Sequence, residues 1–385
     1  MFKIEKKLVI WIEEHVSLLF FAAITLLGFY IRYIGRTVTS PDMRDFLLPW
    51  YYGMKEAGGL SALSVQMGDY NVLYQTLIAL MTYLPLNPQT MYKGLACIFD
   101  YLLAFAAASV VCESLKKPKF GGYFNAVYTA VLFLPTVVIN SAYWGQCDSM
   151  YTFLMLMALW LLYRGRYKTS FFMLGLAFAL KLQTIFVLPF IIAYYLAKKS
   201  FSILNFGITL LTFWLSGIPA YVAGRDLLTP FTIYRMQTGT YSKMWLNSRS
   251  FWILFGDDYN AYRGLAICLA LCLCGLGCYL IMLKKKKTDT PVRFIATAAW
   301  FLWVCIFFLP AMHERYAYAL DVILIITAFL DKKYVKFAAL SAVMSFISYG
   351  PFLTQYGGVN MQHALIETFM FIWFSAVLLN DKEPA

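Results

Sequence analysis

The sequence predicts an all-α, polytopic transmembrane protein, and three observations lead to this prediction. The chain of 385 residues is 61% hydrophobic and only 14% charged, whereas soluble proteins are about 45–50% apolar. Its apolar residues form long runs, many of them near the roughly 20 residues that a membrane-spanning helix needs. The net charge of +12 lies in short basic clusters between these runs, as is typical of cytoplasmic connections. The basic charge therefore indicates membrane topology and no nucleic-acid partner.

About twelve segments are predicted to span the membrane, with both chain ends in the cytoplasm. They lie at about 16–33, 91–112, 122–140, 149–164, 168–182, 184–197, 201–219, 261–283, 293–310, 316–330, 335–350 and 362–380. The basic residues of the inner connections then include Lys116, Lys117, Lys119, Arg164, Arg166, Lys198, Lys199, Lys284–Lys287, Lys332 and Lys333, with Lys382 near the chain end. Several segments are short, above all 168–182 and 184–197, so we expect tilted or broken helices there.

The apolar run at about 72–86 decides the orientation of all that follows. If this run crossed the membrane, the later basic clusters would lie outside. The run is about 15 residues long, shorter than a span, and is bounded by Pro85 and Pro88. We therefore place it in a first external loop, residues 36–90; a second long external loop covers residues 220–260. Both loops are rich in aromatic residues, which argues against disorder, and we expect short interfacial helices at 42–56 and 71–84.

Four polar clusters interrupt the apolar sequence, and all of them fall on the external side of this topology. They are Asp42 with Asp45; Trp144, Gln146 and Asp148; Lys181 with Gln183; and His313, Glu314 and Arg315. Charged side chains at membrane depth are costly and are functional candidates by default. A carboxylate can act as a general base, and Lys181 and Arg315 suit the binding of a phosphate leaving group. The sequence contains no GxxxxGK[ST] loop and no GxSxG motif, so nucleotide hydrolysis and serine-type acyl transfer have no support.

Each of these candidates also has a structural interpretation. Asp42 and Asp45 could cap the helix that follows them. Trp144 could be an aromatic anchor at the membrane interface, and Lys181 could extend to the lipid headgroups. His313 could be an ordinary interfacial histidine.

Two further charged residues lie apart from the four clusters. Asp100 lies inside a predicted span, where it is either a hydrogen-bonding group between helices or a site residue. Arg249, in the second external loop, faces either headgroups or a substrate phosphate, and we include it among the candidate substrate-binding residues. The eight cysteines show no metal-ligand spacing with histidine, and two aspartates three residues apart do not predict a metal site. We therefore expect no cofactor.

Taken together, the motifs resemble the GT-C class of integral-membrane glycosyltransferases. Within this class the chain is similar to bacterial and archaeal proteins that are related to the second mannosyltransferase of glycosylphosphatidylinositol assembly. The similarity runs over most of the chain. The motifs that carry it are Ser40-Pro41-Asp42, Phe46–Tyr51, Asp69–Tyr74, Trp144–Ser149, Lys181-Leu182-Gln183 and His313–Tyr316.

The resemblance implies one GT-C-like domain, residues 1–385, that transfers a hexose with inversion at the anomeric carbon. The donor would be a polyprenyl-phosphate-linked sugar and the acceptor a glycan or glycolipid. The protein would lie among the membrane lipids of a bacterial plasma membrane, with its site on the outer face. Asp42 would take the proton of the acceptor hydroxyl; Asp45 is the alternative base, because an aspartate at its position departs from the family pattern. The remaining clusters would bind substrate. Since members of the class differ in metal dependence, a role for a divalent metal stays open.

A transporter or flippase of a lipid-linked saccharide is the alternative function, because twelve spans with both ends inside are common among transporters. Many transporters contain two related halves with paired interrupted helices. We find no such halves in the sequence, and the polar residues gather on one side, which favours an enzyme. A non-catalytic subunit of a glycan-assembly complex is a third hypothesis. The sequence does not identify the sugar.

Overall fold

Nearly all regular structure of the protein is helical. The structure is a computed structural model that describes residues 2–283 and 288–380; the predicted inner residues Lys284–Lys287 and Lys382 lie outside the described residues. Besides helices, the described chain contains one short parallel pairing of β1 (Trp245–Leu246) with β2 (Met312–His313). The all-α class is confirmed.

Seven helical segments in the described chain are long and apolar enough to cross a membrane. They are α1 (Lys3–Gly35), α4 (Pro88–Ser114), α10 (Leu204–Leu215) with α11 (Ile218–Val222), α13 (Tyr259–Leu283), α14 (Pro291–Phe308), η7 (Lys332–Tyr334) with α16 (Val335–Thr354), and α17 (Met361–Asn380). An eighth is a pair bent by 55°, made of α5 (Gly122–Leu132) and of α6 (Pro135–Val138) with η3 (Ile139–Trp144). Pro135 begins the second half, and proline cannot continue the hydrogen-bond ladder of a preceding helix.

Four shorter apolar helices complete the bundle. They are α7 (Asp148–Tyr163), α8 (Tyr167–Leu180), η4 (Leu182–Val187) with α9 (Leu188–Lys198), and α15 (Tyr318–Leu330). Together with the eight longer segments, they coincide with the twelve segments predicted from the sequence. Each is shorter than the roughly 20 residues of a full span, so the count of twelve stays a prediction. Lys181 is extended between α8 and η4, with φ −153° and ψ 133°, so the chain is broken in the region where short helices were predicted.

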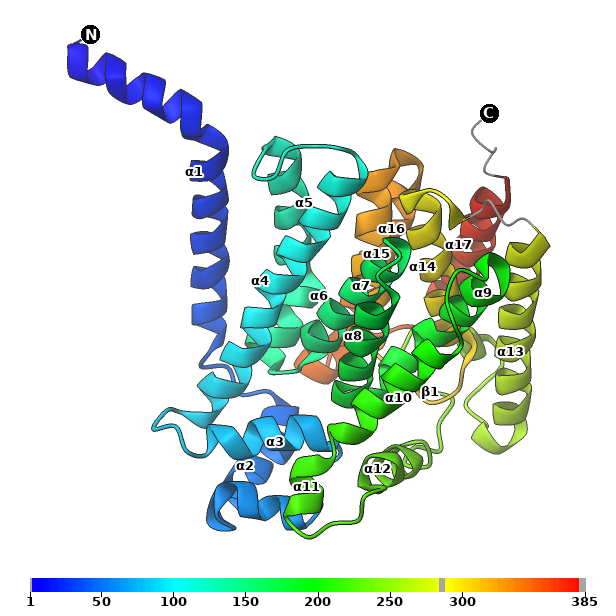
Figure 1. Cartoon of the computed structure of the whole chain (residues 1–385). Coiled ribbons are helices and arrows are strands. Elements are labelled where there is room, and N and C mark those ends of the chain that lie inside the picture. The colour runs from blue at the N-terminus through cyan, green and yellow to red at the C-terminus, as the bar shows by residue number, and fades with distance from the viewer. Residues whose placement is uncertain (1, 284–287, 381–385) are drawn as a thin grey trace.

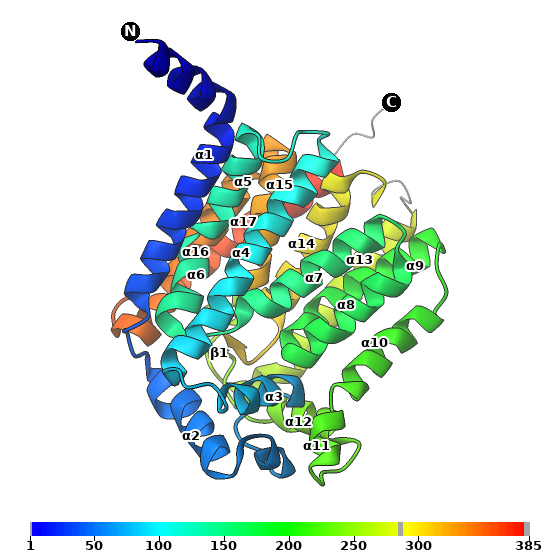
Figure 2. The same cartoon turned by 60° about the vertical axis from the view of Figure 1, so that its left-hand side comes forward.

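Short helices gather at one end of the bundle, which we call the site end (Figures 1 and 2). They are η1 (Met43–Leu47), α2 (Leu48–Glu56), η2 (Gly59–Ser64), α3 (Val72–Met81) and α12 (Thr229–Gln237), with η5 (Phe251–Leu254) in the same loop as α12. The helices predicted at 42–56 and 71–84 are therefore present. Helix α3 has ten residues and is about 15 Å long, half the hydrocarbon thickness of a bilayer. The external placement of residues 36–90 stays a prediction.

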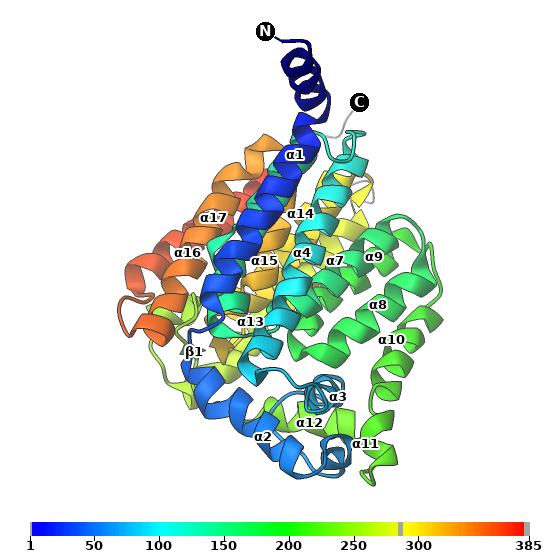
Figure 3. The ribbon, with the colours of Figure 1, turned by 90° about the vertical axis from the view of Figure 1, so that its left-hand side faces the viewer.

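The two ends of the described chain lie at the end of the bundle opposite the short helices (Figures 1 and 2). The apolar stretch of α14 is 89% buried, whereas that of α1 is 17% buried. Helix α1 stands at the left edge of the bundle in Figure 1 and runs across the front of it in Figure 3. Apolar side chains of α4, α7, α14 and α15 form the main core. This core holds the helices whose ends carry the polar clusters.

Candidate active site

The first polar residues after α1 form a turn in which Ser40, and not Asp42, acts as the cap. The Met43 backbone N–H donates to Ser40 Oγ at 3.1 Å, and the same hydroxyl donates to the Trp144 carbonyl at 2.6 Å. Asp42 makes no capping hydrogen bond, so the capping interpretation of Asp42 is wrong. Its carboxylate instead accepts hydrogen bonds from side chains of a distant segment, Trp144 and Gln146.

The Asp42 carboxylate is held through one of its two oxygens. Trp144 Nε1 donates to Asp42 Oδ2 at 3.0 Å, and the Gln146 side-chain amide donates to the same atom. The Tyr70 hydroxyl donates to Gln146 Oε1 at 2.8 Å, which turns the NH₂ end of this amide toward Asp42. The hydrogen bonds that Asp42 accepts from Trp144 and Gln146, both in the described part of the chain, are thus accepted by the same oxygen, Oδ2. Asp42 Oδ1 therefore keeps its capacity to accept a proton.

Gly145 allows its two neighbours to reach the same carboxylate. It follows η3 with a φ of 87°, in the left-handed region that glycine adopts without steric cost. A Cβ atom at this position would lie 2.5 Å from Met43 Cε. The sharp turn therefore requires glycine, and it directs Trp144 and Gln146 to one side.

A second buried carboxylate, Asp148, lies in the first turn of α7. Lys181 Nζ lies 2.5 Å from Asp148 Oδ1, and Asn140 Nδ2 donates to Oδ2 at 2.8 Å. Lys181 is only 6% exposed, so its side chain does not extend to headgroups as one interpretation held. The break after α8 places this lysine inside the bundle, where it neutralises Asp148.

We expect Lys181→Met to lower the free energy of unfolding by about 3–5 kcal/mol, because it removes the cation in direct contact with the buried Asp148 carboxylate. Thermal unfolding of the purified protein in nanodiscs measures this loss. The double variant Lys181→Met with Asp148→Asn should recover most of it, since the carboxylate that lost its lysine is then replaced by a neutral amide. A single variant as stable as the native protein would contradict the ion pair.

Arg315 lies between the two carboxylates. Its Nη1 is 3.9 Å from Asp42 Oδ2, its Nε is 3.9 Å from Asp148 Oδ2, and its guanidinium carbon lies 5.7 Å from the centre of the Trp144 ring. Glu314 Oε1 is 3.4 Å from Nη1. Distances of 3.9 Å exceed those of hydrogen bonds, and among the described residues Arg315 Nε has no hydrogen-bond partner. The guanidinium thus keeps donors for an added anion.

Burial governs the charge of the two residues before Arg315. Burial, together with the positive charges of Arg315 and Lys181, lowers the pKa of His313 to about 3, so its imidazole is neutral at ordinary pH. Burial raises the pKa of Glu314, although Arg315 opposes this shift. The His313 ring packs edge-on against Tyr241 with 4.5 Å between ring centres, and its Nε2 has no hydrogen-bond partner in the described chain. His313 therefore offers the site a neutral polar group.

The low pKa of His313 makes stability depend on pH. Between about pH 6.5 and pH 3 the unfolded chain binds a proton at His313 that the folded protein excludes, so stability falls as the pH falls through this window. We expect the native protein to lose about 2 kcal/mol more than His313→Gln between pH 7 and pH 5. Thermal unfolding of both proteins across this range measures the difference, and parallel curves would contradict a neutral buried histidine.

Two of the predicted site residues lie outside this arrangement, and a third lies next to it. Asp45 is exposed and pairs with its neighbour Arg44, through contacts of 2.7 and 2.9 Å. Arg249 is buried among other helices, and its described partners are Ser341, Asp321 and Glu367. Gln183, two residues after Lys181, is buried with no hydrogen-bond partner for its Oε1 in the described chain. We call the gathered residues the polar cluster: Asp42, Trp144, Gln146, Asp148, Lys181, Gln183, His313, Glu314 and Arg315.

The structure adds positioning residues that the sequence analysis did not single out. Tyr70 orients Gln146, and Asn140 holds Asp148. Tyr70 lies inside one of the motifs, but nothing in the sequence distinguishes Asn140 from other polar residues of its segment. Asp100 binds Arg32 Nε at 2.8 Å and accepts a hydrogen bond from the Ser141 hydroxyl. It therefore links α1, α4 and η3, which favours the helix-to-helix interpretation.

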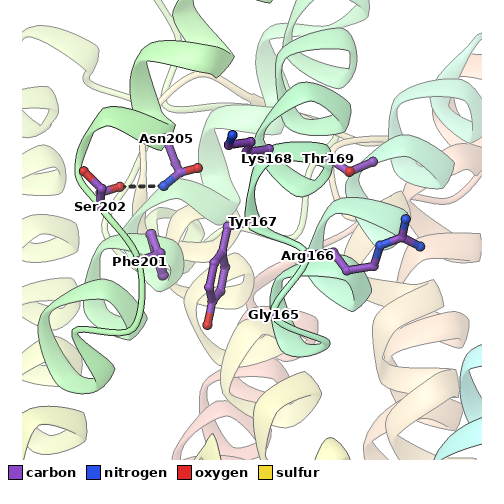
Figure 4. A pocket seen from close by; sticks show the side chains of 8 residues that line it. All are labelled: Gly165, Arg166, Tyr167, Lys168, Thr169, Phe201, Ser202 and Asn205. Atoms are coloured by element: carbon purple, nitrogen blue, oxygen red, sulfur yellow. Dashed lines mark hydrogen bonds between the residues drawn. The ribbon is translucent and has the colours of Figure 1, made fainter.

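A cavity of about 370 Å³, shown in Figure 4, lies where α7 ends and α8 begins. Its lining comes from the α7–α8 and α9–α10 connections: Gly165, Arg166, Tyr167, Lys168, Thr169, Phe201, Ser202 and Asn205. Asp148 begins α7 and the cavity lies beyond its last residue, so roughly 24 Å of helix separates the two. The cavity is not part of the candidate site.

One family matches the chain in comparisons with known proteins. The profile of glycosyltransferase family 87 matches residues 70–310, which is more than half of the chain. The matched range contains Tyr70, Trp144, Gln146, Asp148 and Lys181. No curated protein matches the chain.

Proposed function

The chain belongs to glycosyltransferase family 87, and from this premise we propose that it is an inverting, GT-C-like membrane enzyme. Its donor in this proposal is a polyprenyl-phosphate-linked hexose, and its acceptor is a hydroxyl of a glycan or glycolipid. The observation that carries the proposal is the Asp42 carboxylate, held on one oxygen by Trp144 and Gln146 with Arg315 beside it. This arrangement combines a base with a cation that has free donors.

In the proposed reaction, Asp42 Oδ1 takes the proton of the acceptor hydroxyl as that oxygen attacks the anomeric carbon. The bond between this carbon and the phosphate oxygen breaks on the opposite face, so the configuration inverts. The polyprenyl phosphate leaves with the bonding electrons, and Asp42 ends the step protonated. Trp144 and Gln146 stabilise the charged carboxylate before transfer and fix its orientation.

The leaving phosphate needs positive charge, and the polar cluster supplies it. Arg315 Nε has no hydrogen-bond partner in the described chain. Lys181 is paired with Asp148, the carboxylate that Arg315 also approaches. We propose that both stabilise the charge that develops on the phosphate as the bond breaks. Gln183 and neutral His313 add polar groups that need no counter-charge. Because these two cations already serve the phosphate, the proposal includes no metal ion and no cofactor.

We propose that the site end faces outward from a bacterial plasma membrane. Basic residues lie in or next to the connections α4–α5, α7–α8 and α9–α10, namely Lys116, Lys117, Lys119, Arg164, Arg166, Lys168, Lys198 and Lys199. Basic connections favour the cytoplasmic side. Asp148 and Lys181, at the other ends of α7 and α8, then face the outer leaflet. In this orientation the donor lipid enters from that leaflet.

The test is a transfer assay with purified protein in nanodiscs. Radiolabelled polyprenyl-phosphate hexoses are supplied with lipid-linked glycan acceptors, and the labelled product is separated. Transfer to an acceptor supports the proposal. Absence of transfer from every donor, combined with movement of a donor across sealed liposomes that contain the protein, would overturn it in favour of a flippase.

A further inference from the structure

The second long loop contains a buried arginine that the proposed chemistry does not use. Arg249 follows β1 and is 1% exposed. Its Nη1 donates to the backbone carbonyl and to the hydroxyl of Ser341 on α16, each at 2.9 Å. Such a side chain is out of reach of headgroups, and it reaches into the packed helices from the loop.

Two fully buried carboxylates face Arg249 from two other helices. Its Nη2 lies 3.5 Å from Asp321 Oδ1 on α15, and its Nε lies 3.7 Å from Glu367 Oε1 on α17. Ser341 Oγ donates to Asp321 Oδ1 at 2.6 Å, and Trp303 Nε1 of α14 donates to Glu367 Oε1 at 2.7 Å. One loop side chain thus contacts three helices directly, and a fourth, α14, is linked to it through Glu367. The loop at Arg249 is therefore attached to the packed helices.

The residues just before Arg249 are attached to the strand that precedes the Glu314–Arg315 turn. Trp245 pairs with Met312 and Leu246 with His313, and Asn247 forms a bridge with His313. One residue earlier in the loop, the Met244 carbonyl accepts a hydrogen bond from the Ala311 N–H at 3.0 Å. These backbone contacts hold the entry to the turn.

The exit of the same turn is held as well. Arg315 is followed by α15, and Asp321 lies in the first turn of that helix. Arg249 is joined to Asp321 through the Ser341 hydroxyl, which accepts a hydrogen bond from Arg249 Nη1 and donates one to Asp321 Oδ1; the Nη2 contact with the same carboxylate is longer, at 3.5 Å. Residues 244–249 are therefore attached to the chain on both sides of Glu314 and Arg315.

This double attachment matters because the contacts of Arg315 itself are loose. Its distances of 3.9 Å to Asp42 and Asp148 do not define the position of the guanidinium as hydrogen bonds would. The backbone must then set that position. A displacement of about 1 Å in a catalytic group can cost 10²-fold in rate.

We propose that residues 244–249 form a strap that positions Arg315, and that Arg249 anchors the strap. The inference rests on the proposed function for the role of Arg315. It assigns Arg249 a positioning role instead of the substrate contact expected from the sequence. The competing explanation is that Arg249 only neutralises Asp321 and Glu367.

A charge-neutral triple variant separates these two explanations. Arg249→Met, Asp321→Asn and Glu367→Gln together remove the buried charges, so the protein should unfold at nearly the native temperature. We expect the kcat of the triple variant for sugar transfer to fall by about 10²-fold. Adding Arg315→Met to the triple variant should lower kcat no further than Arg315→Met does alone, because both changes disable Arg315. A triple variant with native kcat, or with a loss that multiplies that of Arg315→Met, would overturn the strap.

Two further variants guard against misfolding and general loop effects. Arg249→Lys keeps the charge but loses the three separate nitrogens that face Ser341, Asp321 and Glu367, so it should fold and lose less kcat than the triple variant. Arg235→Met changes an exposed arginine of α12 in the same loop and should leave kcat unchanged. If Arg249→Lys had native kcat, or if Arg235→Met matched the triple variant, the strap would be wrong.

A measurement that does not depend on enzymatic turnover tests this inference separately from the proposed function. Hydrogen exchange of residues 309–317 is measured by mass spectrometry on the full chain in nanodiscs. The triple variant should exchange these amides faster than the native protein, and Arg235→Met should not. Unchanged exchange overturns the strap even if the protein is a glycosyltransferase, whereas faster exchange supports it even if no donor is found.

Discussion

Replacing Asp42 by asparagine is expected to lower kcat for sugar transfer by about 10²–10⁴-fold, the usual contribution of a general base. Asparagine retains one oxygen that can accept from Trp144 and Gln146, which now bind Asp42 Oδ2. The fold of the site should therefore survive. The second oxygen becomes an NH₂ group, which cannot take a proton from the acceptor. Steady-state transfer with matched amounts of folded protein in nanodiscs measures the effect.

Asp45→Asn is the matched control for this variant. It makes the same chemical change three residues away, on a side chain that is exposed and paired with Arg44. We expect native turnover. If Asp45→Asn abolished transfer and Asp42→Asn did not, the base would be Asp45 and the assignment made from the geometry would be wrong.

Replacing Arg315 by methionine should have the second largest effect, a fall in kcat of about 10²–10³-fold. The guanidinium is the cation between Asp42 and Asp148 that retains an unpartnered nitrogen in the described chain. Its charge is needed most as the phosphate leaves, so its loss should act on the chemical step. Arg315→Lys keeps the charge but not the fork, and should fall between methionine and the native residue. Turnover measured at a saturating concentration of the donor separates an effect on kcat from an effect on KM.

Arg44→Met is the control for Arg315, because Arg44 is an exposed arginine paired with one carboxylate at the same end of the protein. It should leave both kcat and KM unchanged. An Arg315→Met protein with native kcat and a raised KM would mean that Arg315 binds the donor equally in the ground state and the transition state. That result would contradict the leaving-group role.

Much of the architecture follows from local sequence signals. Hydrophobic runs, their lengths and the basic clusters between them predict twelve helical segments, and all twelve are present as helices or broken helices in the described chain. The length of the run at 72–86 likewise predicts a loop position, and helix α3 within it has only ten residues. The gathering of four clusters follows from topology, because segments that end on one side of a membrane share a face.

The choice between neighbouring residues could not be predicted in this way. Asp42 and Asp45 are three residues apart, and such positions lie on the same side of a helix. The family resemblance favours Asp42, but the physical distinction comes from the packing of a segment 102 residues away, which brings Trp144 to Asp42. The Asp42 assignment therefore depends on tertiary contacts.

Arg249 illustrates a different limit. Its sequence neighbours are polar and its loop is long, which favours an exposed site. In the structure its partners come from α15, α16 and α17, and these helices lie far along the chain. The buried position of this loop arginine depends on two carboxylates, Asp321 and Glu367, that lie inside distant helices.

The most direct test of the central claim is the anomeric configuration of the product that the native protein makes. The protein is given a polyprenyl-phosphate hexose of known configuration and its acceptor, and the new linkage is assigned by NMR. Direct attack by a hydroxyl that Asp42 activates predicts a product with the configuration opposite to that of the donor. A product that retains the donor configuration would contradict this mechanism, because retention requires a second displacement or a different reaction path.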